Sequence, residues 1–376
     1  MTAVAVVGPA CYAVLRFMRA VNLAVRVILS LGVSALFVWL SLRNADLRAV
    51  GRAIASASVP RMAAYAVLLV VIHLVRTVRW GILLEPLGHV GFKRLNSASA
   101  VGFMLLMLLP FRLGEFARPI LIARPPQGTG VRLRRSGAMA SIVVERLVDG
   151  IATGLLGVIA LHALGTTASG EYAPAARKAS LLVAAGFAVV CGLLLAALFL
   201  RERTLRAVDA LLRLFSPRLA SAAVSMLDAF ISAVHIGSGF KAVLFFLLTA
   251  LYWGLAGFGL WLLAPAFGFH ITPLMAATIL ALQVVGVMIP AGPGMIGTLQ
   301  LFTQIALSLF VADAFSRNSP VAARAAAYAN TTWMLQFGVQ VGLGVTFMLL
   351  GHVALRGLFG RSDDPAADPE PTGAAP

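Results

Sequence analysis

The sequence predicts an all-α, polytopic helical membrane bundle with about six full spans and two re-entrant or broken helical segments. Of its 376 residues, 60% are hydrophobic and only 12% are charged, whereas a soluble domain carries about 25% charged residues. The apolar residues are also gathered in long runs, and a spanning helix needs about 20 of them in succession. Soluble enzymes, fibrous proteins and secreted disulfide scaffolds are therefore excluded.

Six of the apolar runs are uninterrupted, and each is expected to cross the membrane once. They cover residues 24–42, 62–84, 137–164, 180–200, 241–263 and 326–351. Two further runs, 97–123 and 272–311, are interrupted by proline and glycine. Proline removes a backbone donor and breaks helices, and glycine permits conformations that other residues avoid. We expect these two runs to be re-entrant hairpins or broken helices; if both crossed fully, the bundle would have eight spans.

The distribution of basic residues favours six crossings. The formal net charge is +16, and cytoplasmic loops concentrate Lys and Arg. With six crossings, both termini share the more basic side with segments 79–95, 124–135 and 201–241, although the basic 43–61 loop then falls on the opposite side. We therefore expect a cell-membrane protein with cytoplasmic termini, whose positive charge serves topology and anionic lipid rather than nucleic acid.

Three regions are expected along the chain. Residues 1–20 form an N-terminal cytoplasmic segment, residues 21–357 form the transmembrane domain, and residues 358–376 form a disordered tail of Pro, Ala and acidic residues. Residues 202–235 place apolar side chains at helical spacing opposite arginines. This pattern predicts an amphipathic helix on the cytoplasmic surface or a loop helix packed on the bundle.

Seven charged side chains lie in or beside the apolar runs. Each costs about 2.5–3.5 kcal/mol at the centre of a membrane helix, so they are expected to pair, to snorkel or to face a water-filled cavity. The excess of one positive charge suits an anionic guest such as a lipid phosphate, whose oxygens match the donor fork of arginine. The seven are Arg76, Arg112, Glu115, Arg118, Glu145, Arg146 and Asp149.

Residue spacing groups these charges on helix faces. Glu145 and Asp149 are four residues apart and share one face, and charges recur every three residues from Arg112 to Arg118. On the second span, Arg79 and Trp80 lie near the same face as Arg76, and Trp80 suits the membrane interface. Two interpretations remain open and are compatible: salt bridges that fix helix register, and a polar pathway through the membrane.

The second interrupted run, VMIPAGPGMIGTLQ, contains no charged residue. A helix that begins near Gly297 would direct its positive dipole end at the break, which is the geometry of an anion site. The alternative is a kink that serves packing alone.

No motif indicates catalysis or a cofactor. The six histidines are scattered, Cys11 and Cys191 are far apart, and there is no GxxxxGK[ST] sequence. We therefore expect no catalytic residues, no metal site, no cofactor and no enzyme activity.

Four motifs occur in a fixed order: Arg76-x-x-Arg79-Trp80, the stretch PFRLGEFARP at 110–119, Glu145-Arg146-Leu147-x-Asp149, and Pro290-x-x-Pro293-Gly294-x-x-Gly297. In these the chain resembles the lysylphosphatidylglycerol synthase transmembrane family, or flippase-like domain family, over residues 20–355. The resemblance implies that the charged residues from Arg112 to Asp149 line a lipid-headgroup site and that Pro293, Gly294 and Gly297 form a facing re-entrant turn.

The chain departs from this family in two respects. Gln300 stands where the family has a glutamate, and only about twenty residues follow the last span, which is too few for the soluble aminoacyl-transferase domain of the bifunctional members. Lysyl transfer is therefore not expected.

The main hypothesis is a lipid flippase or translocase that binds an anionic headgroup in an intramembrane cavity. The alternative is a non-transporting accessory protein that anchors a lipid or a partner enzyme. The expected partners are membrane lipids, with a second copy of the chain or a lipid-modifying enzyme as the protein partner. The expected headgroup-binding residues are Arg76, Arg79, Arg112, Glu115, Arg118, Glu145, Arg146 and Asp149, and the expected re-entrant turn contains Pro290, Pro293, Gly294 and Gly297.

Overall fold

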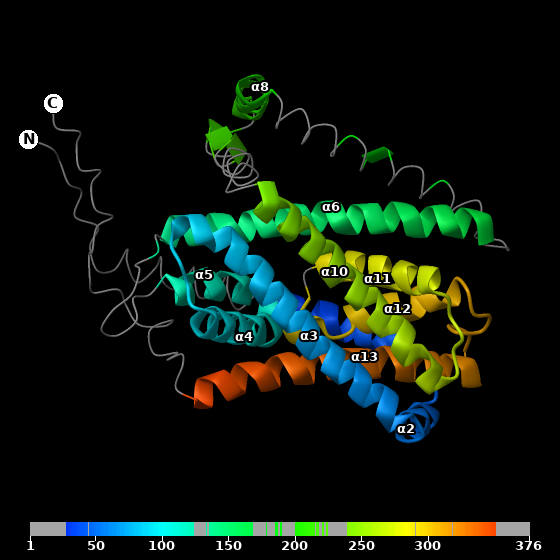
Figure 1. Ribbon diagram of the computed structural model, residues 1–376. Coiled ribbons are helices and arrows are strands. Elements are labelled where there is room, and N and C mark those ends of the chain that lie inside the picture. The colour runs from blue at the N-terminus through cyan, green and yellow to red at the C-terminus, as the bar shows by residue number, and fades with distance from the viewer. Residues whose placement is uncertain are drawn as a thin grey trace, which may run out of the picture.

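The chain folds as a helical bundle, as the sequence predicts (Figure 1). In the part of the chain described by the computed structural model, every regular element is a helix. The described residues are 28–43, 45–123, 133, 135–167, 178, 185–186, 189, 200–214, 216–217, 220–221, 223–224, 239–289, 291–317 and 319–350. The regions expected at 1–20 and 358–376 lie outside these residues, and so does most of the run expected at 180–200.

Three of the described helices are long and apolar enough to cross a membrane, namely α3 (Val59–Leu84), α10 (Gly239–Leu263) and α13 (Pro320–Leu349). The helix Ile28–Leu42 and α2 (Leu47–Ala55) together pass the same test but are bent by 81°. The run expected at 137–164 is a single helix of 33 residues, α6 (Arg135–Thr167). Of the segment expected to be amphipathic, α8 (Arg201–Arg213) is described as a helix.

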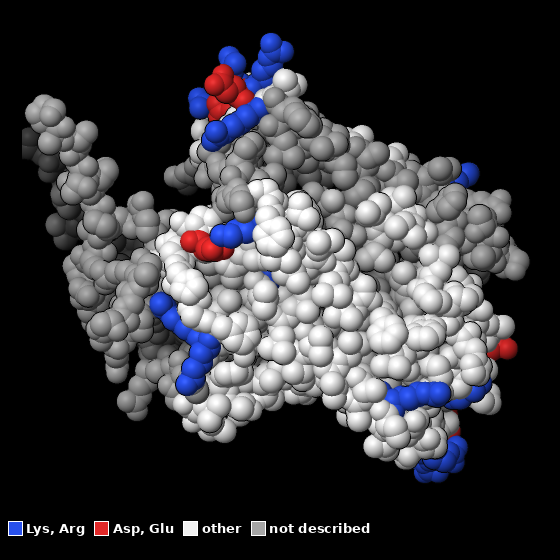
Figure 2. Space-filling view, viewed as in Figure 1, with Lys and Arg blue, Asp and Glu red and all other residues white. Residues whose placement is uncertain are grey.

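Basic segments lie at both ends of the bundle, with an apolar region between them. At one end η1 (Glu85–Leu87) follows α3, and Glu85 pairs with Lys241 of α10 at 2.6 Å. At the other end α2 packs against α13, and the Arg324 guanidinium lies 5.6 Å from the ring centroid of Phe269. Figure 2 shows a broad uncharged expanse between charged groups at the edges of this face. Such a surface suits the hydrocarbon layer of a membrane.

The first interrupted run folds back on itself as a helical hairpin. It comprises α4 (Phe92–Leu108), η2 (Pro110–Phe116) and α5 (Ala117–Ile122). Arg94, near the start of α4, donates to the Ile122 carbonyl at the end of α5 over 2.6 Å, so the chain returns to the end of the bundle from which it came. At the tip, Arg112 adopts a φ of 57°, a conformation that is uncommon for residues other than glycine.

The second interrupted run forms another hairpin, which begins at the opposite end of the bundle. It comprises α11 (Pro273–Met288), η4 (Pro293–Met295) and α12 (Thr298–Ser308), and its arms are joined by a 2.7 Å bond from Gln283 to Thr303. Gly294 and Gly297 adopt φ values of 68° and 90°, which glycine reaches without a steric cost. The helix Ile28–Leu42 supports this tip, since Ser34 Oγ accepts a 2.8 Å bond from the backbone N–H of Gly292.

The two hairpin tips approach each other inside the bundle. A cavity of about 230 Å³ lies between them, lined by Leu106, Leu109 and Arg112 from the first tip and by Val287, Gly292 and Met295 from the second, among others. Both interrupted runs are therefore broken helices, as expected from their prolines and glycines. Pro290 lies outside the described residues.

Candidate functional site

A buried group of ion pairs joins α3, α5 and α6. Arg79 Nη2 lies 2.8 Å from Glu145 Oε1, and Arg79 Nη1 lies 2.5 Å from Asp149 Oδ1. The second Glu145 oxygen accepts from Arg118 Nη1 at 2.9 Å. The Arg79 and Glu145 side chains are 0% exposed. Because a buried charge is tolerated only when it is paired and hydrogen-bonded, this group is a fixed structural element; we call these four residues the buried ion-pair core.

A second, more accessible group of charges adjoins this core. At the tip of the first hairpin, Arg112 pairs with Glu115 at 2.8 Å. Arg146 of α6 lies 3.8 Å from Glu115, 3.8 Å from Glu145 and 3.7 Å from Asp149. These longer contacts leave the Arg146 side chain 31% exposed and that of Arg112 34% exposed. Both guanidinium groups can therefore reach a guest molecule while remaining near compensating carboxylates.

Arg76 is held by aromatic rings. Its guanidinium carbon lies 3.7 Å from the ring centroid of Phe103 and 5.3 Å from that of Tyr252, distances typical of cation–π contacts. Its Nε is buried and has no hydrogen-bond partner among the described residues. Aromatic faces attract a cation without neutralising it, so Arg76 keeps its positive charge available.

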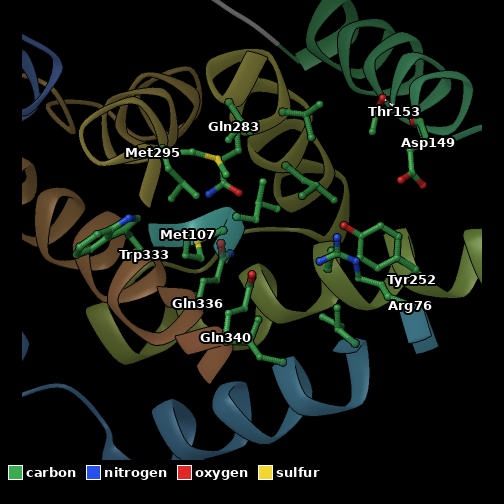
Figure 3. Close-up of a pocket in the computed structure, with 18 of the residues that line it drawn as sticks. Arg76, Met107, Asp149, Thr153, Tyr252, Gln283, Met295, Trp333, Gln336 and Gln340 are labelled. Atoms are coloured by element: carbon green, nitrogen blue, oxygen red, sulfur yellow. Dashed lines mark hydrogen bonds between the residues drawn. The ribbon is translucent and has the colours of Figure 1, made fainter. Parts of the chain in front are cut away.

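These cations border a cavity of about 300 Å³ between the hairpin tips and the long helices. The cavity is lined by residues from the middle of α3, α10 and α13, including Ile72, Tyr252 and Gln336. Its charged lining residues are Arg76, Arg112, Arg146 and Asp149, an excess of two positive charges. Figure 3 shows Arg76 beside Tyr252, with Asp149 and Thr153 projecting from the neighbouring α6. Ligand pockets in proteins have volumes of about 300–1,000 Å³.

The rest of the cavity is lined by uncharged polar and aromatic groups. Gln283 of α11 and Gln336 and Gln340 of α13 point toward the same space, close to Trp333 (Figure 3). Trp333 Nε1 donates to the Gly294 carbonyl over 2.8 Å and so ties α13 to the tip of the second hairpin. One cavity therefore has a cationic region and a neutral, amide-rich region.

The comparison with protein families identifies the chain. The model of the lysylphosphatidylglycerol synthase TM region matches residues 27–337. The chain belongs to this family. It is accordingly a membrane protein associated with lipid chemistry, and the resemblance found in its motifs is confirmed. Searches of curated proteins and of solved structures give no match.

The structure brings together all eight charged residues expected from the motifs. Arg76 contacts aromatic rings, and the other seven residues are joined by ion pairs in one continuous network. Only half of the eight line the cavity, however. The four that do so are Arg76, Arg112, Arg146 and Asp149. The other four are not part of the lining, namely Arg79, Glu115, Arg118 and Glu145.

The family's glycine-rich turn contributes less to the cavity than its sequence suggests. Gly294 lines the cavity, whereas Pro293 and Gly297 do not. The N–H of Gly297 donates to Gln300 Oε1 over 2.7 Å, and a Cβ at this position would lie 2.7 Å from the Ser34 carbonyl. This end of α12 is therefore packed against the first helix, and the Gln300 side chain caps it.

One expectation for α3 was wrong. Trp80 is completely buried rather than placed at the membrane interface, and its Nε1 donates to Ser141 of α6 over 3.0 Å. The Arg118 guanidinium carbon lies 4.3 Å from the centroid of the Trp80 ring. Trp80 therefore positions the buried ion-pair core.

The uncharged polar residues that line the cavity were not among those predicted from the sequence. Gln336 and Gln340 are four residues apart in an apolar helix, and this spacing could have revealed them. Tyr252 and Gln283 are single polar residues in apolar runs and carry no comparable signal. Among the described residues no group of three or more His, Cys, Asp and Glu side chains is placed to bind a metal ion.

Proposed function

We propose that this protein is a lipid flippase or translocase that binds an anionic headgroup in the 300 Å³ cavity between its hairpin tips and the long helices. The excess positive charge of the cavity lining is the main observation in support. Charged side chains inside a membrane domain carry a high free-energy cost and usually mark a pathway or a binding site. Membership of the lysylphosphatidylglycerol synthase TM region family supports a membrane lipid as the guest.

In this proposal the two groups of charges have different tasks. The buried ion-pair core holds α3, α5 and α6 in register, while Arg76, Arg112 and Arg146 bind the phosphate. The lipid tails stay in the bilayer as the headgroup passes. The hairpins act as re-entrant segments from opposite sides of the membrane, and separation of their tips opens the path past Arg112, which borders both the large cavity and the one between the tips.

Replacement of Arg112 and Arg146 tests the proposal. In Arg112→Gln and Arg146→Gln proteins reconstituted in liposomes, we expect lipid scrambling to slow by about 10- to 100-fold, because a hydrogen bond to a charged group contributes about 1.5–3 kcal/mol. The measurement is the rate at which a fluorescent anionic phospholipid becomes accessible to a membrane-impermeant quencher. Thermal unfolding in detergent monitors the fold of each variant.

Arg61→Gln is the matched control, because Arg61 is exposed near the start of the same helix that carries Arg76. It should scramble lipid at the rate of the unmodified protein. If Arg112→Gln and Arg146→Gln were folded and equally fast, the proposal would be abandoned.

The second candidate function is a non-transporting accessory protein that anchors a lipid. It is favoured by the ion pairs that Arg112, Arg146 and Asp149 already make within the chain, because a fixed network suits a static anchor. The same liposomes separate the two functions. An anchor would retain labelled lipid with dependence on Arg146 but would not increase its rate of transfer between leaflets.

A further inference from the structure

Five exposed arginines lie at the end of the bundle that carries α2. Two belong to α2 itself, one to the turn that precedes it, one to α13, which packs against α2, and one to the turn before α13. Figure 2 shows basic side chains over α2 and beside it. In the described part of the chain none of the five forms an ion pair. They are Arg43, Arg48, Arg52, Arg317 and Arg324.

Two aspartates at this end make local hydrogen bonds. Asp46 Oδ1 caps α2 by accepting from the backbone N–H of Arg48 over 2.9 Å, and Asp313 Oδ1 accepts from Ser316 Oγ over 2.9 Å. Neither carboxylate forms an ion pair with an arginine side chain among the described residues. The positive charge of this end is therefore available to an external anion.

The location of this charge requires an explanation other than topology. Basic residues mark the cytoplasmic end of a membrane bundle, so this rule accounts for one end only. The opposite end is basic as well, since it carries Lys93 on α4 and Lys241 on α10. One of the two ends must therefore use its charge for another purpose. At the α2 end the arginines are unpaired, whereas Lys241 is paired with Glu85.

α2 lies across the end of the bundle. Its axis is bent by 81° from that of the preceding helix, and Val50 is buried against the hydrophobic core. Arg48 and Arg52 are four residues apart and share the exposed side of the helix. A short helix in this orientation, with apolar residues on one side and arginines on the other, has the features of a helix in the plane of the lipid headgroups.

Exposed apolar side chains accompany the arginines. Trp39 is 57% exposed and Leu47 is 64% exposed, and the Arg43 guanidinium carbon lies 5.2 Å from the centroid of the Trp39 ring. Tryptophan is enriched at the boundary between hydrocarbon and water. A soluble anion would contact the arginines alone. A bilayer would take up the apolar side chains in its hydrocarbon layer and place the arginines among its headgroups.

We propose that this end of the bundle binds the headgroups of anionic phospholipids in the adjacent leaflet. The binding surface, which we call the α2 surface, consists of Trp39, Arg43, Leu47, Arg48 and Arg52, with Arg317 and Arg324 at its edge. None of these residues lines either cavity. The α2 surface is therefore separate from the site of the proposed function and does not depend on it. Lipid bound there holds α2 against the bundle.

The test is hydrogen–deuterium exchange of the full-length protein in lipid nanodiscs. One sample contains only phosphatidylcholine, and in the other a third of the lipid is phosphatidylglycerol. A lipid that binds only the folded helix reduces the fraction of time for which that helix is open. Each arginine near an anionic surface contributes about 1 kcal/mol, so the amides of α2 should exchange about five- to 25-fold more slowly with phosphatidylglycerol. In about 1 M NaCl, which screens charges beyond about 3 Å, most of this protection should disappear.

Two double variants separate charge from structure. Arg48→Gln/Arg52→Gln should lose most of the protection, whereas Arg48→Lys/Arg52→Lys should keep it, because lysine retains the positive charge. Both arginines are exposed, so both double variants should melt at the temperature of the unmodified protein. Arg146→Gln alters the cavity and should leave the protection of α2 unchanged. A loss of protection in Arg146→Gln would assign the effect to the cavity and overturn the inference.

Three further results would contradict the inference. The first is equal exchange of α2 in the two kinds of nanodisc, and the second is undiminished protection in Arg48→Gln/Arg52→Gln. The third is protection of α2 in phosphatidylcholine nanodiscs by soluble glycerol phosphate, which would make the ligand a free anion. Failure of the proposed function has a different signature, because Arg112→Gln and Arg146→Gln would then scramble lipid at the unmodified rate while phosphatidylglycerol still protected α2.

Discussion

Replacement of Glu145 by glutamine is expected to destabilise the protein more than any other conservative change in the charge network. The two carboxylate oxygens of Glu145 pair with Arg79 at 2.8 Å and with Arg118 at 2.9 Å, and all three side chains are at most 2% exposed. Glutamine keeps the size of the side chain but removes its charge. Breaking a buried ion pair costs about 3–5 kcal/mol, because the remaining charge stays buried without compensation. The melting temperature in detergent should fall accordingly, with reduced yield of monodisperse protein.

Two comparisons separate this effect from a general loss of charge. Glu202→Gln removes a carboxylate from α8 that is 89% exposed and 3.9 Å from Arg206, and exposed pairs contribute only about 0–1 kcal/mol. In Glu145→Gln, Arg79 keeps its ion pair with Asp149, whereas Arg118 loses its carboxylate partner. The double variant Arg118→Met/Glu145→Gln removes this uncompensated cation and should regain part of the stability lost in Glu145→Gln. If Glu145→Gln melted at the same temperature as Glu202→Gln, the buried ion-pair core would not stabilise the bundle.

The charge network could be predicted from the sequence because charged residues stand out within apolar runs. A charge inside an apolar run must find a partner, and the spacing of Glu145 and Asp149 places both on one helix face. In the structure both contact Arg79. The helix breaks were predictable for a related reason: proline and glycine act locally, so their effect does not depend on the rest of the fold.

The division of the charges between core and cavity could not be predicted. Arg76 and Arg79 are three residues apart on the same helix, yet Arg79 contacts two carboxylates and Arg76 contacts aromatic rings. Spacing specifies which residues share a helix face, but the partners of Arg79 come from segments 66 to 170 residues away. The interrupted hairpins determine these partners, since their tips bring Arg112 and Gly294 to one cavity. The burial of Trp80 could not be predicted for the same reason, because it depends on contacts with α6.

The second large effect is expected at Gly114, in the tip of the first hairpin. A Cβ atom at this position would lie 2.0 Å from the backbone nitrogen of Leu106 and 2.2 Å from the carbonyl carbon of Leu105. These are backbone atoms of α4 and cannot rotate away, so Gly114→Ala must push the tip from the helix. Overpacking of this kind costs about 1–3 kcal/mol, sometimes more. The displaced tip carries Arg112, so retention of anionic lipid should fall together with the melting temperature.

Gly338→Ala provides the control for Gly114→Ala, because a Cβ on that residue of α13 would meet no atom within 4 Å. Alanine is favoured over glycine within a helix by about 0.5–1 kcal/mol, so this variant should be as stable as the unmodified protein or slightly more so. Its lipid retention should not change, since Gly338 does not line the cavity. A Gly114→Ala protein that melted and bound lipid like Gly338→Ala would mean that the tip is not packed tightly against α4. In that case the hairpin could not hold Arg112 at a fixed position in the cavity.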